Sequence, residues 1–193
     1  MDFSLFTPPQ LISVVIISLL VISIINYVIY NRLFPEFFTR KGIKKSVYRY
    51  LYNDYYTLIE NIDIQCSDDQ QLMIKQLLVS RYGIFILETC HHRGTIYGSH
   101  HQVKWLSKGL MHSNPFYNPH MAQQFTVSLL AEHLKISPKM IKTLIVFTGN
   151  SLFPNHPPSN TCKTQNLIKA ISLHNNMMFS QQSLPNIIEN LKN

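Results

Sequence analysis

A run of 21 residues without a charged side chain, Gln10 to Tyr30, constrains this 193-residue chain more than any other feature. At about 1.5 Å per residue, a helix of that length spans the roughly 30 Å hydrocarbon core of a bilayer. In lipid, all backbone polar groups must be paired within the segment, which enforces the helix. A cleaved signal peptide fits poorly, because the run is too long, no Lys or Arg precedes it and no small-residue cleavage site follows. The sequence therefore predicts an uncleaved, single-pass membrane anchor.

The positive charge of the chain is concentrated directly after this run. The net formal charge is +7, yet residues 50–193 hold eleven Lys and Arg against eight Asp and Glu. Residues 32–49 carry one acid, Glu36, against six basic residues: Arg32, Arg40, Lys41, Lys44, Lys45 and Arg49. By the positive-inside rule, residues 31–193 are expected in the cytoplasm, on the inner face of the inner (cell) membrane.

The three cysteines, Cys66, Cys90 and Cys162, are odd in number and far apart. This spacing argues against a disulfide framework and suits a reducing compartment. No disulfide-linked partner is expected.

The hydrophobic pattern after the anchor predicts one α/β or α+β domain with a mixed β-sheet flanked by helices. We expect a tail (1–9), a membrane helix (10–30), a basic linker (31–41), the domain proper (42–150), and a C-terminal loop and helices that complete it (151–193). Within these, the pattern predicts a helix at 42–54, strands at 57–65, 72–80 and 83–89, and a hairpin within 93–106. A helix at 118–135, a strand at 140–149, a loop at 150–163, and short helices at 164–173 and 183–192 follow.

Motif residues stand in a fixed order within "LLVSRYGIFILETCHHRGTIYGSHHQVKWL" and the following "FYNP". They are Tyr82-Gly83, Ile84-Phe85, Glu88-Thr89, Gly94, Ile96, Gly98, Trp105, Asn118 and Pro119. In this order the sequence resembles the nuclease-related domain family (NERD), whose members look like relatives of nucleases with the restriction-endonuclease fold. The resemblance covers roughly residues 42–150. It implies a restriction-endonuclease-like domain after the membrane helix, with an Mg²⁺ site at the end of a strand.

The sequence departs from the family pattern at the residues that carry its chemistry. The metal-binding Asp of the family falls on Lys75, and the lysine of its Glu-x-Lys motif falls on Cys90. A Gly-Glu pair usually opens the first helix, whereas Gly42 is followed by Ile43. The Gln that commonly follows Asn-Pro falls on Ala122, with Gln123 and Gln124 adjacent. The resemblance thus gives Glu88, Lys75, Cys90 and Gln123 as the candidate catalytic set, of which only Glu88 keeps its register.

Phosphodiester hydrolysis in this fold needs Mg²⁺ held by clustered carboxylates, with a lysine beside the attacking water. Lys75, if it faces Glu88, would place a positive charge where the metal should bind. A relocated site using Asp63 or Asp69 with Glu88 is the alternative, although turn formation is the commoner role of such acids. Mg²⁺ is expected only if the enzyme is active.

Three other arrangements have less support from the residue spacing. Cys90, His92 and His101 match no compact zinc pattern. Cys90 with His92 as base lacks any visible oxyanion motif. Tyr97, Trp105, Phe116 and Tyr117 could stack on bases, but core packing is the more frequent role of such aromatics.

The sequence as a whole predicts a degenerate nuclease that binds nucleic acid (DNA or RNA) or a protein partner at the membrane. The competing hypothesis is an active Mg²⁺-dependent endonuclease. A basic groove would be lined by Arg81, Arg93, Lys104 and Lys108 together with Lys75, and Trp105 is the candidate stacking residue.

Overall fold

The computed structural model describes residues 8–33, 35–51, 56–67 and 70–192, and the chain divides into two compact units. The first unit, Met1–Phe38, contains helix α1 (Pro8–Leu33), and the second is Thr39–Asn193. Asp68 and Asp69 lie outside the described residues, so the predicted metal ligand Asp69 has no described position.

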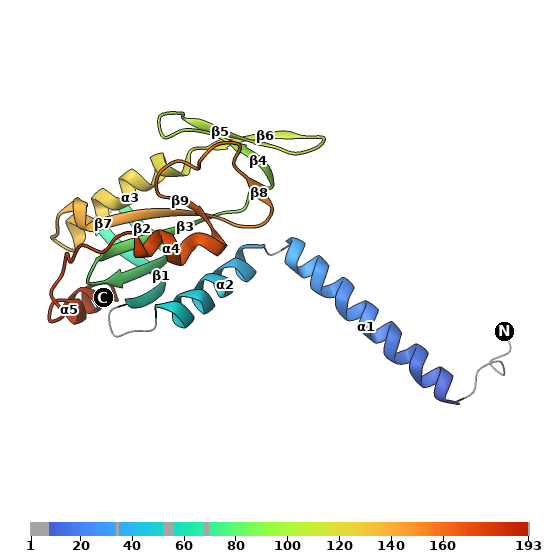
Figure 1. Cartoon of the computed structure of the whole chain (residues 1–193). Coiled ribbons are helices and arrows are strands. Elements are labelled where there is room, and N and C mark those ends of the chain that lie inside the picture. Colours follow the sequence, from blue (N-terminus) through green and yellow to red (C-terminus); the bar gives the residue numbers. More distant parts are fainter. Residues whose placement is uncertain (1–7, 34, 52–55, 68–69, 193) are drawn as a thin grey trace. The chain divides into compact units, whose positions relative to one another are not determined.

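Helix α1 has the length and composition of a membrane span (Figure 1). Its segment Ile12–Ile29 has a mean hydropathy of 2.7, and no side chain in it is buried. The predicted apolar helix at 10–30 is therefore present and extends a few residues further at each end. By length and composition it can cross a membrane.

The second unit contains two β-sheets and most of the remaining helices (Figure 1). Helix α2 (Pro35–Tyr50) begins in the first unit and continues into the second. The strands are β1 (Tyr56–Ser67), β2 (Gln70–Ser80), β3 (Gly83–Cys90), β4 (Gly94–Tyr97), β5 (Lys104–Lys108), β6 (Ser113–Tyr117), β7 (Ile141–Phe147), β8 (Ser151–Leu152) and β9 (Thr161–Lys163). The other helices are α3 (Pro119–His133), α4 (Leu167–Ser172) and α5 (Leu184–Asn190), with 3₁₀ turns η2 (Pro138–Met140) and η3 (Thr164–Asn166).

The large sheet has the order β1-β2-β3-β7-β9. Strands β1, β2 and β3 form an antiparallel meander, whereas β3, β7 and β9 run parallel, so the prediction of a mixed sheet is confirmed. The predicted hairpin of 72–80 with 83–89 is also confirmed, with Leu77 opposite Ile86 and Ser80 opposite Gly83. Strands β6, β8 and β9 were not predicted.

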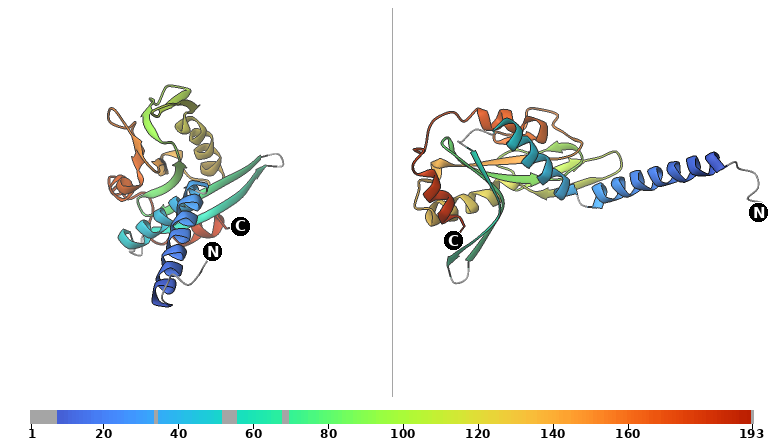
Figure 2. Two further views of the ribbon diagram at one scale, coloured as in Figure 1. Left: turned by 90° about the vertical axis from the view of Figure 1, so that its right-hand side faces the viewer. Right: turned by 90° about the horizontal axis from the view of Figure 1, so that it is seen from below.

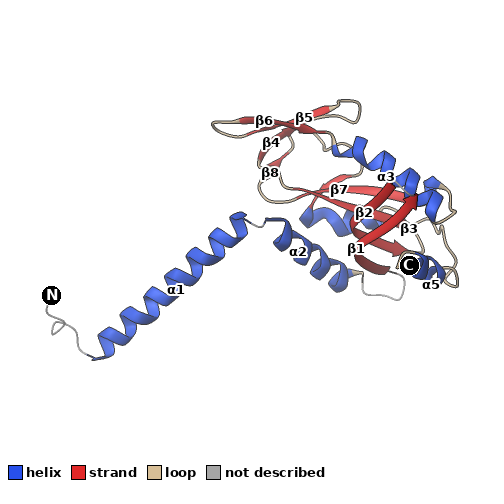
Figure 3. Ribbon diagram, turned by 180° about the vertical axis from the view of Figure 1, so that it is seen from behind, coloured by secondary structure: helices blue, strands red, loops and turns tan. Residues whose placement is uncertain are grey.

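Helices cover both faces of the large sheet (Figure 3). On one face, α3 and α5 bury Leu130, Leu134 and Ile187 against strand residues such as Ile84 and Ile86. On the other face, α2 and α4 bury a second core: Ile43, Val47, Leu51, Leu78, Phe85, Leu87, Leu144, Val146, Cys162, Leu167 and Ile171. The apolar faces of these amphipathic helices thus pack on a sheet that is apolar on both sides.

The β1–β2 hairpin changes the face that it buries partway along its length. Leu58 packs in the core under α2 and α4, and Ile59 in the core under α3, as alternation requires. Beyond Asn61, whose φ is +54°, Ile62 and Ile64 pack with Ile59, so the alternation has shifted by one residue. Figure 2 shows the far end of this hairpin projecting from the rest of the domain.

The small sheet, in the order β6-β5-β4-β8, packs beyond the carboxyl ends of β3 and β7. Its inward residues Ile96 and Trp105 form a third core with Ile145 and Phe147 of β7. Strand β4 is antiparallel to β5, which confirms the hairpin predicted within 93–106. The small sheet is therefore packed against the carboxyl ends of β3 and β7, next to the end of the strand that carries Glu88.

Candidate functional site at the end of β3

Strand β3 leaves the core at Glu88. Residues Gly83 to Leu87 are buried, and Glu88, Thr89 and Cys90 are half-buried. In the parallel pairing with β7, Glu88 lies beside Ile145 and Cys90 beside Phe147. Because alternate residues share a face, Glu88 and Cys90 both point to the α3 side of the sheet.

Gln123 of α3 contacts Glu88 directly. Its Nε2 donates to Oε2 of Glu88 at 3.0 Å, and its side chain is only 7% exposed. Its Oε1 is also buried and has no hydrogen-bond partner among the described residues. The Gln expected near position 122 is thus supplied by the next residue, which the helix turns toward the end of β3.

The cap of α3 fixes the position of Gln123. Asn118 is 1% exposed, and its Oδ1 accepts the N–H of His120 at 3.0 Å. Pro119 occupies the first turn, where a missing N–H carries no cost. The Nδ2 of Asn118 lies within 3.3 Å of three carbonyl oxygens of the preceding loop, those of Ser99, His100 and Gln102. The Asn-Pro motif therefore joins the 99–102 loop to the helix that carries Gln123.

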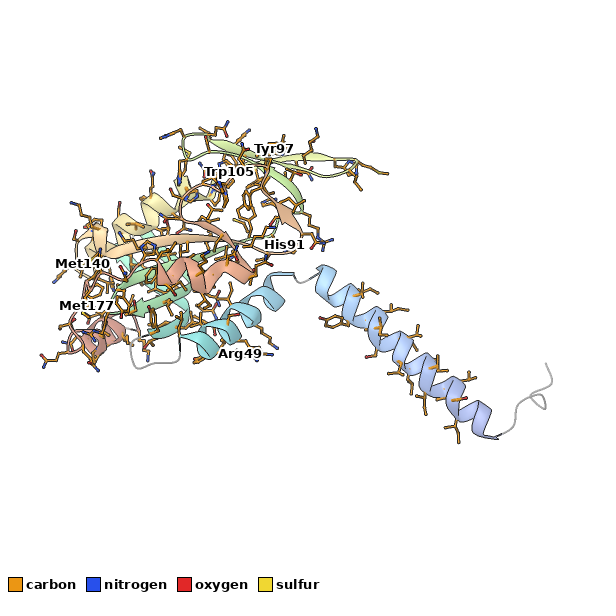
Figure 4. The ribbon with its side chains drawn as sticks, in the orientation of Figure 1. Arg49, His91, Tyr97, Trp105, Met140 and Met177 are labelled. Carbon is orange, nitrogen blue, oxygen red and sulfur yellow. The ribbon has the colours of Figure 1, made fainter. Side chains whose placement is uncertain are left out.

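Gly98 and Trp105 form a second structural pair. Trp105 is 1% exposed, and its Nε1 donates to the carbonyl of Ser99 at 2.9 Å. A Cβ at position 98 would overlap the indole ring, so the ring requires glycine there. Trp105 points inward and cannot stack on a base, so its predicted nucleic-acid role is wrong and its core role is confirmed (Figure 4).

The predicted Lys75–Glu88 pairing lies just beyond the paired part of β2 and β3. The last pair of the ladder is Leu77 opposite Ile86. Because the strands are antiparallel, extending the same register by two residues would place Lys75 opposite Glu88. Lys75 is half-buried and lies next to Gln76, which is buried and donates to Glu60 at 3.1 Å. That Lys75 faces Glu88 stays a prediction.

The residues at the end of β3 do not fit an Mg²⁺ ion. Mg²⁺ requires a near-octahedral shell of oxygen ligands with at least one or two carboxylates. The three groups here are one carboxylate, already hydrogen-bonded to Gln123, an amide and the thiol of Cys90. Among the residues that the structure describes, no three His, Cys, Asp or Glu side chains gather as metal ligands.

Of the two alternative ligands predicted from sequence, Asp63 is the one that the structure describes. Asp63 lies in the projecting half of the β1–β2 hairpin, is exposed, and accepts from Nε2 of Gln71 at 2.8 Å with both carboxylate oxygens. The zinc arrangement of Cys90, His92 and His101 is not formed, because the described residues contain no such cluster. Cys90 packs against the third core, and His92 stacks on Phe116 with ring centroids 3.7 Å apart.

Histidines near the site are packed groups with lowered basicity. Burial and the nearby His100 lower the pKa of His120 to about 4, and its Nε2 lies 2.8 Å from Oγ1 of Thr161. Burial, with a smaller contribution from His91, also lowers the pKa of His92. Both rings are therefore neutral at pH 7 and contribute no positive charge to the site.

The basic residues predicted to line a groove lie on different elements. Arg81 precedes β3 and contacts Sδ of Met177 at 3.2 Å, whereas Arg93 follows β3 at its other end. Arg81 and Arg93 therefore lie at opposite ends of an eight-residue strand, and that they line one groove stays a prediction. Lys104 and Lys108 lie on β5, so Arg93, Lys104 and Lys108 all belong to the small sheet or the loop that enters it.

Two tyrosines and two lysines share the outward side of the small sheet. Lys104 is paired with Tyr117 of β6, and Tyr97 of β4 is paired with Leu106. Tyr97 and Tyr117 are 44% and 75% exposed, whereas Trp105 and Ser107 between the lysines are buried. Nζ of Lys104 lies 5.6 Å from the Tyr117 ring centroid. We call the outward face formed by Tyr97, Lys104, Lys108 and Tyr117 the tyrosine platform (Tyr97 is labelled in Figure 4).

A mixed sheet with helices on both faces, and a carboxylate at the end of its third strand, defines a nuclease-like α+β protein. The family model of the nuclease-related domain (NERD) matches residues 39–148, which is more than half of the chain. The chain therefore belongs to the nuclease-related domain family. No curated protein and no solved structure matched it.

Proposed function

We propose that this protein is a membrane-anchored nuclease-related domain that binds nucleic acid and does not cleave it. The observation that carries the first half of the proposal is the state of Glu88. It accepts a hydrogen bond from a buried glutamine, and Cys90 stands where the family has a lysine. A site of this composition binds a divalent cation poorly, and the lysine of the Glu-x-Lys motif, which would help to activate water, is replaced by a thiol.

The motif residues that remain have structural roles. Gly98 makes room for Trp105, Trp105 closes the third core, and Asn118 caps α3. A chain that keeps these residues and replaces the metal ligand and the lysine retains the fold without its hydrolytic groups. Binding is then the activity that the fold can still provide.

The charge distribution favours a polyanionic ligand. Residues 89–193 carry nine Lys and Arg but only two acids, Glu132 and Glu189. The small sheet lies within this part of the chain, and no Asp or Glu occurs between Glu88 and Glu132. Phosphate groups would therefore meet Arg93, Lys104 and Lys108 without a nearby acid to repel them.

The tyrosine platform favours single-stranded over duplex nucleic acid. Exposed aromatic side chains on a sheet stack on unpaired bases, and neighbouring lysines neutralise the phosphates between them. Tyr97 and Tyr117 stand on strands two apart and about 12 Å from each other by sheet spacing, so each ring would receive a different base. A base inside a duplex presents no free face to either ring.

The test is oligonucleotide binding by the full chain in detergent, followed by fluorescence anisotropy. We expect a single strand to bind more tightly than the matching duplex. Tyr97→Ala or Tyr117→Ala should weaken binding about 5- to 150-fold, at 1–3 kcal/mol per stacked base. Tyr48→Ala, which removes an exposed tyrosine of α2, is the matched control and should leave affinity unchanged. Equal binding by all four proteins would contradict the platform.

A plasmid-cleavage assay with Mg²⁺ or Mn²⁺ tests the absence of hydrolysis. We expect no cleavage by the full chain and none by Glu88→Gln. Cleavage that Glu88→Gln abolishes would instead support the alternative, an active endonuclease with relocated carboxylates. The location on the cytoplasmic face of the inner membrane is part of the proposal and is supported by the basic residues that follow α1.

A further inference from the structure

The turn that joins β5 to β6 presents two apolar side chains at its tip. The β5–β6 ladder runs from Lys104 opposite Tyr117 to Lys108 opposite Ser113. Beyond it, the N–H of Gly109 donates to the carbonyl of His112 at 2.8 Å and closes the turn. Leu110 is fully exposed and Met111 is 89% exposed.

This composition is unusual for the tip of a hairpin. Turn positions are normally filled by Gly, Asn, Asp, Ser or Pro, which satisfy the backbone and prefer water. Here a closed turn holds Leu110 and Met111 away from both sheets. Moving two such side chains out of water is favourable, because the hydrophobic effect grows with the apolar area removed from water. The tip therefore gains most from an apolar environment that lies outside the domain.

The surroundings of the tip are basic. Lys108 precedes the turn and Lys104 lies one β-strand length behind it. Arg93 is held against the same strand, because its carbonyl accepts from Oγ of Ser107. An apolar tip with cations behind it is complementary to a bilayer with anionic headgroups, where the negative surface potential attracts Lys and Arg.

We propose that residues 109–112 insert into the headgroup and upper acyl region of an anionic membrane leaflet, as a second membrane contact besides α1. If α1 spans a bilayer, it anchors the chain to a membrane, and Leu110 and Met111 are the side chains that would enter that membrane. This inference does not rest on the stacking residues of the proposed nucleic-acid site, since Tyr117 pairs with Lys104 at the end of the β5–β6 ladder away from the turn and Tyr97 pairs with Leu106 in the middle of β5. Lys108 belongs to both surfaces, so the apolar residues Leu110 and Met111 are what distinguish the tip.

The experiment uses the full chain, reconstituted into vesicles that contain brominated acyl chains and an anionic lipid. Met111→Trp places a fluorophore at the tip, and the one native tryptophan, Trp105, is buried and provides a constant background. Leu173→Trp, at a position 74% exposed beside α4, is the matched control. We expect brominated lipid to quench the tip fluorophore several-fold more strongly than the control fluorophore, and we expect the emission of the Met111→Trp variant to shift to the blue.

Two further variants show whether the tip itself is responsible. Leu110→Asp in the Met111→Trp background should abolish the extra quenching, and Lys108→Gln should reduce it in anionic vesicles. Equal quenching of the Met111→Trp and Leu173→Trp variants would overturn the proposal, as would quenching that survives Leu110→Asp. A tip emission that responds to an oligonucleotide in detergent, but not to brominated lipid, would assign the tip to nucleic acid and also overturn it.

Discussion

A single buried amide holds the loop after β4 to the helix that contacts Glu88. Asn118 uses its carbonyl oxygen to cap α3 and its amino group to bind the 99–102 loop, and its own N–H donates to the carbonyl of Val103 at 2.9 Å. A side chain of similar size without both a donor and an acceptor could not make these contacts. The role of the Asn-Pro motif is therefore to position residues rather than to react.

Replacing this amide should destabilise the domain. Asn118→Ala removes the cap and leaves buried carbonyl groups without a donor, at a cost of about 2–3 kcal/mol in the free energy of unfolding. Urea denaturation of the full chain in detergent, followed by Trp105 fluorescence, measures the change. Asn114→Ala, at an exposed position of β6, is the control and should change stability by less than about 0.5 kcal/mol.

The pKa of His120 predicts loss of stability in acid. The folded value is about 4, below the value of 6.5 expected in the unfolded chain. Between these values the unfolded state binds a proton that the folded state does not, so stability falls as the pH drops from 6.5 toward 4. Above pH 6.5 both states are neutral and His120 adds no pH dependence.

Comparison with His120→Gln isolates this contribution. Wild type should lose about 2–3 kcal/mol more than the variant between neutral pH and pH 4. The measurement is urea denaturation at the two pH values, with His101→Gln, an exposed loop position, as the control. Parallel losses in wild type and His120→Gln would mean that another group controls acid stability.

At the scale of secondary-structure elements, the β1–β2 hairpin is the feature that periodicity could not describe. The alternation is regular on either side of Asn61 and shifted across it, so that Ile59 and Ile62 both reach the core under α3. A left-handed residue gives the strand the additional twist that this change of face needs. Asn tolerates that conformation better than most residues do.

The requirement at position 61 can be tested with two substitutions. Asn61→Val, a β-branched residue at a φ of +54°, should cost about 1–3 kcal/mol. Asn61→Gly should be nearly neutral, because glycine adopts this φ readily. Thermal unfolding of the two variants beside wild type measures both, and an equally stable Asn61→Val would show that the strand does not depend on this conformation.

At the scale of the whole molecule, the fold and the chemistry of a nuclease are separable. The two cores on either side of the large sheet involve neither Glu88 nor Cys90. Substitution of the metal ligands therefore leaves most of the packing unchanged. A chain of this kind can keep the domain as a scaffold while new surfaces, such as the tyrosine platform, take over its function.

Restoring the missing groups tests this separation. Lys75→Asp combined with Cys90→Lys should rebuild a carboxylate pair and a lysine at the end of β3. We expect the double variant to bind Mn²⁺ in calorimetry where the wild-type chain does not, with Lys75→Asp alone binding weakly. A folded double variant that binds no metal would argue that Lys75 does not face Glu88.

The local pattern of the sequence accounts for most of the elements. The uncharged run fixes the length of α1, the Asn-Pro signal fixes the start of α3, and the apolar runs around the Tyr82-Gly83 turn give β2 and β3. These features depend on residues close together in the chain, where helical and strand periodicities are expressed directly. The three residues of β9 lack such a signal, because only pairing with β7 makes that part of a proline-rich loop a strand.

The sequence by itself determined the membrane-length helix, the mixed α+β architecture and the departure from the family motif at Lys75 and Cys90, since each follows from residue type and order. The tertiary structure decided which groups meet and which face water. It turned Gln123 rather than its neighbours toward Glu88, and it buried Trp105 while leaving Tyr97 and Tyr117 exposed. The physical reason is that side chains alternate between the two faces of a strand, and which face is buried depends on contacts between segments that are distant in the sequence.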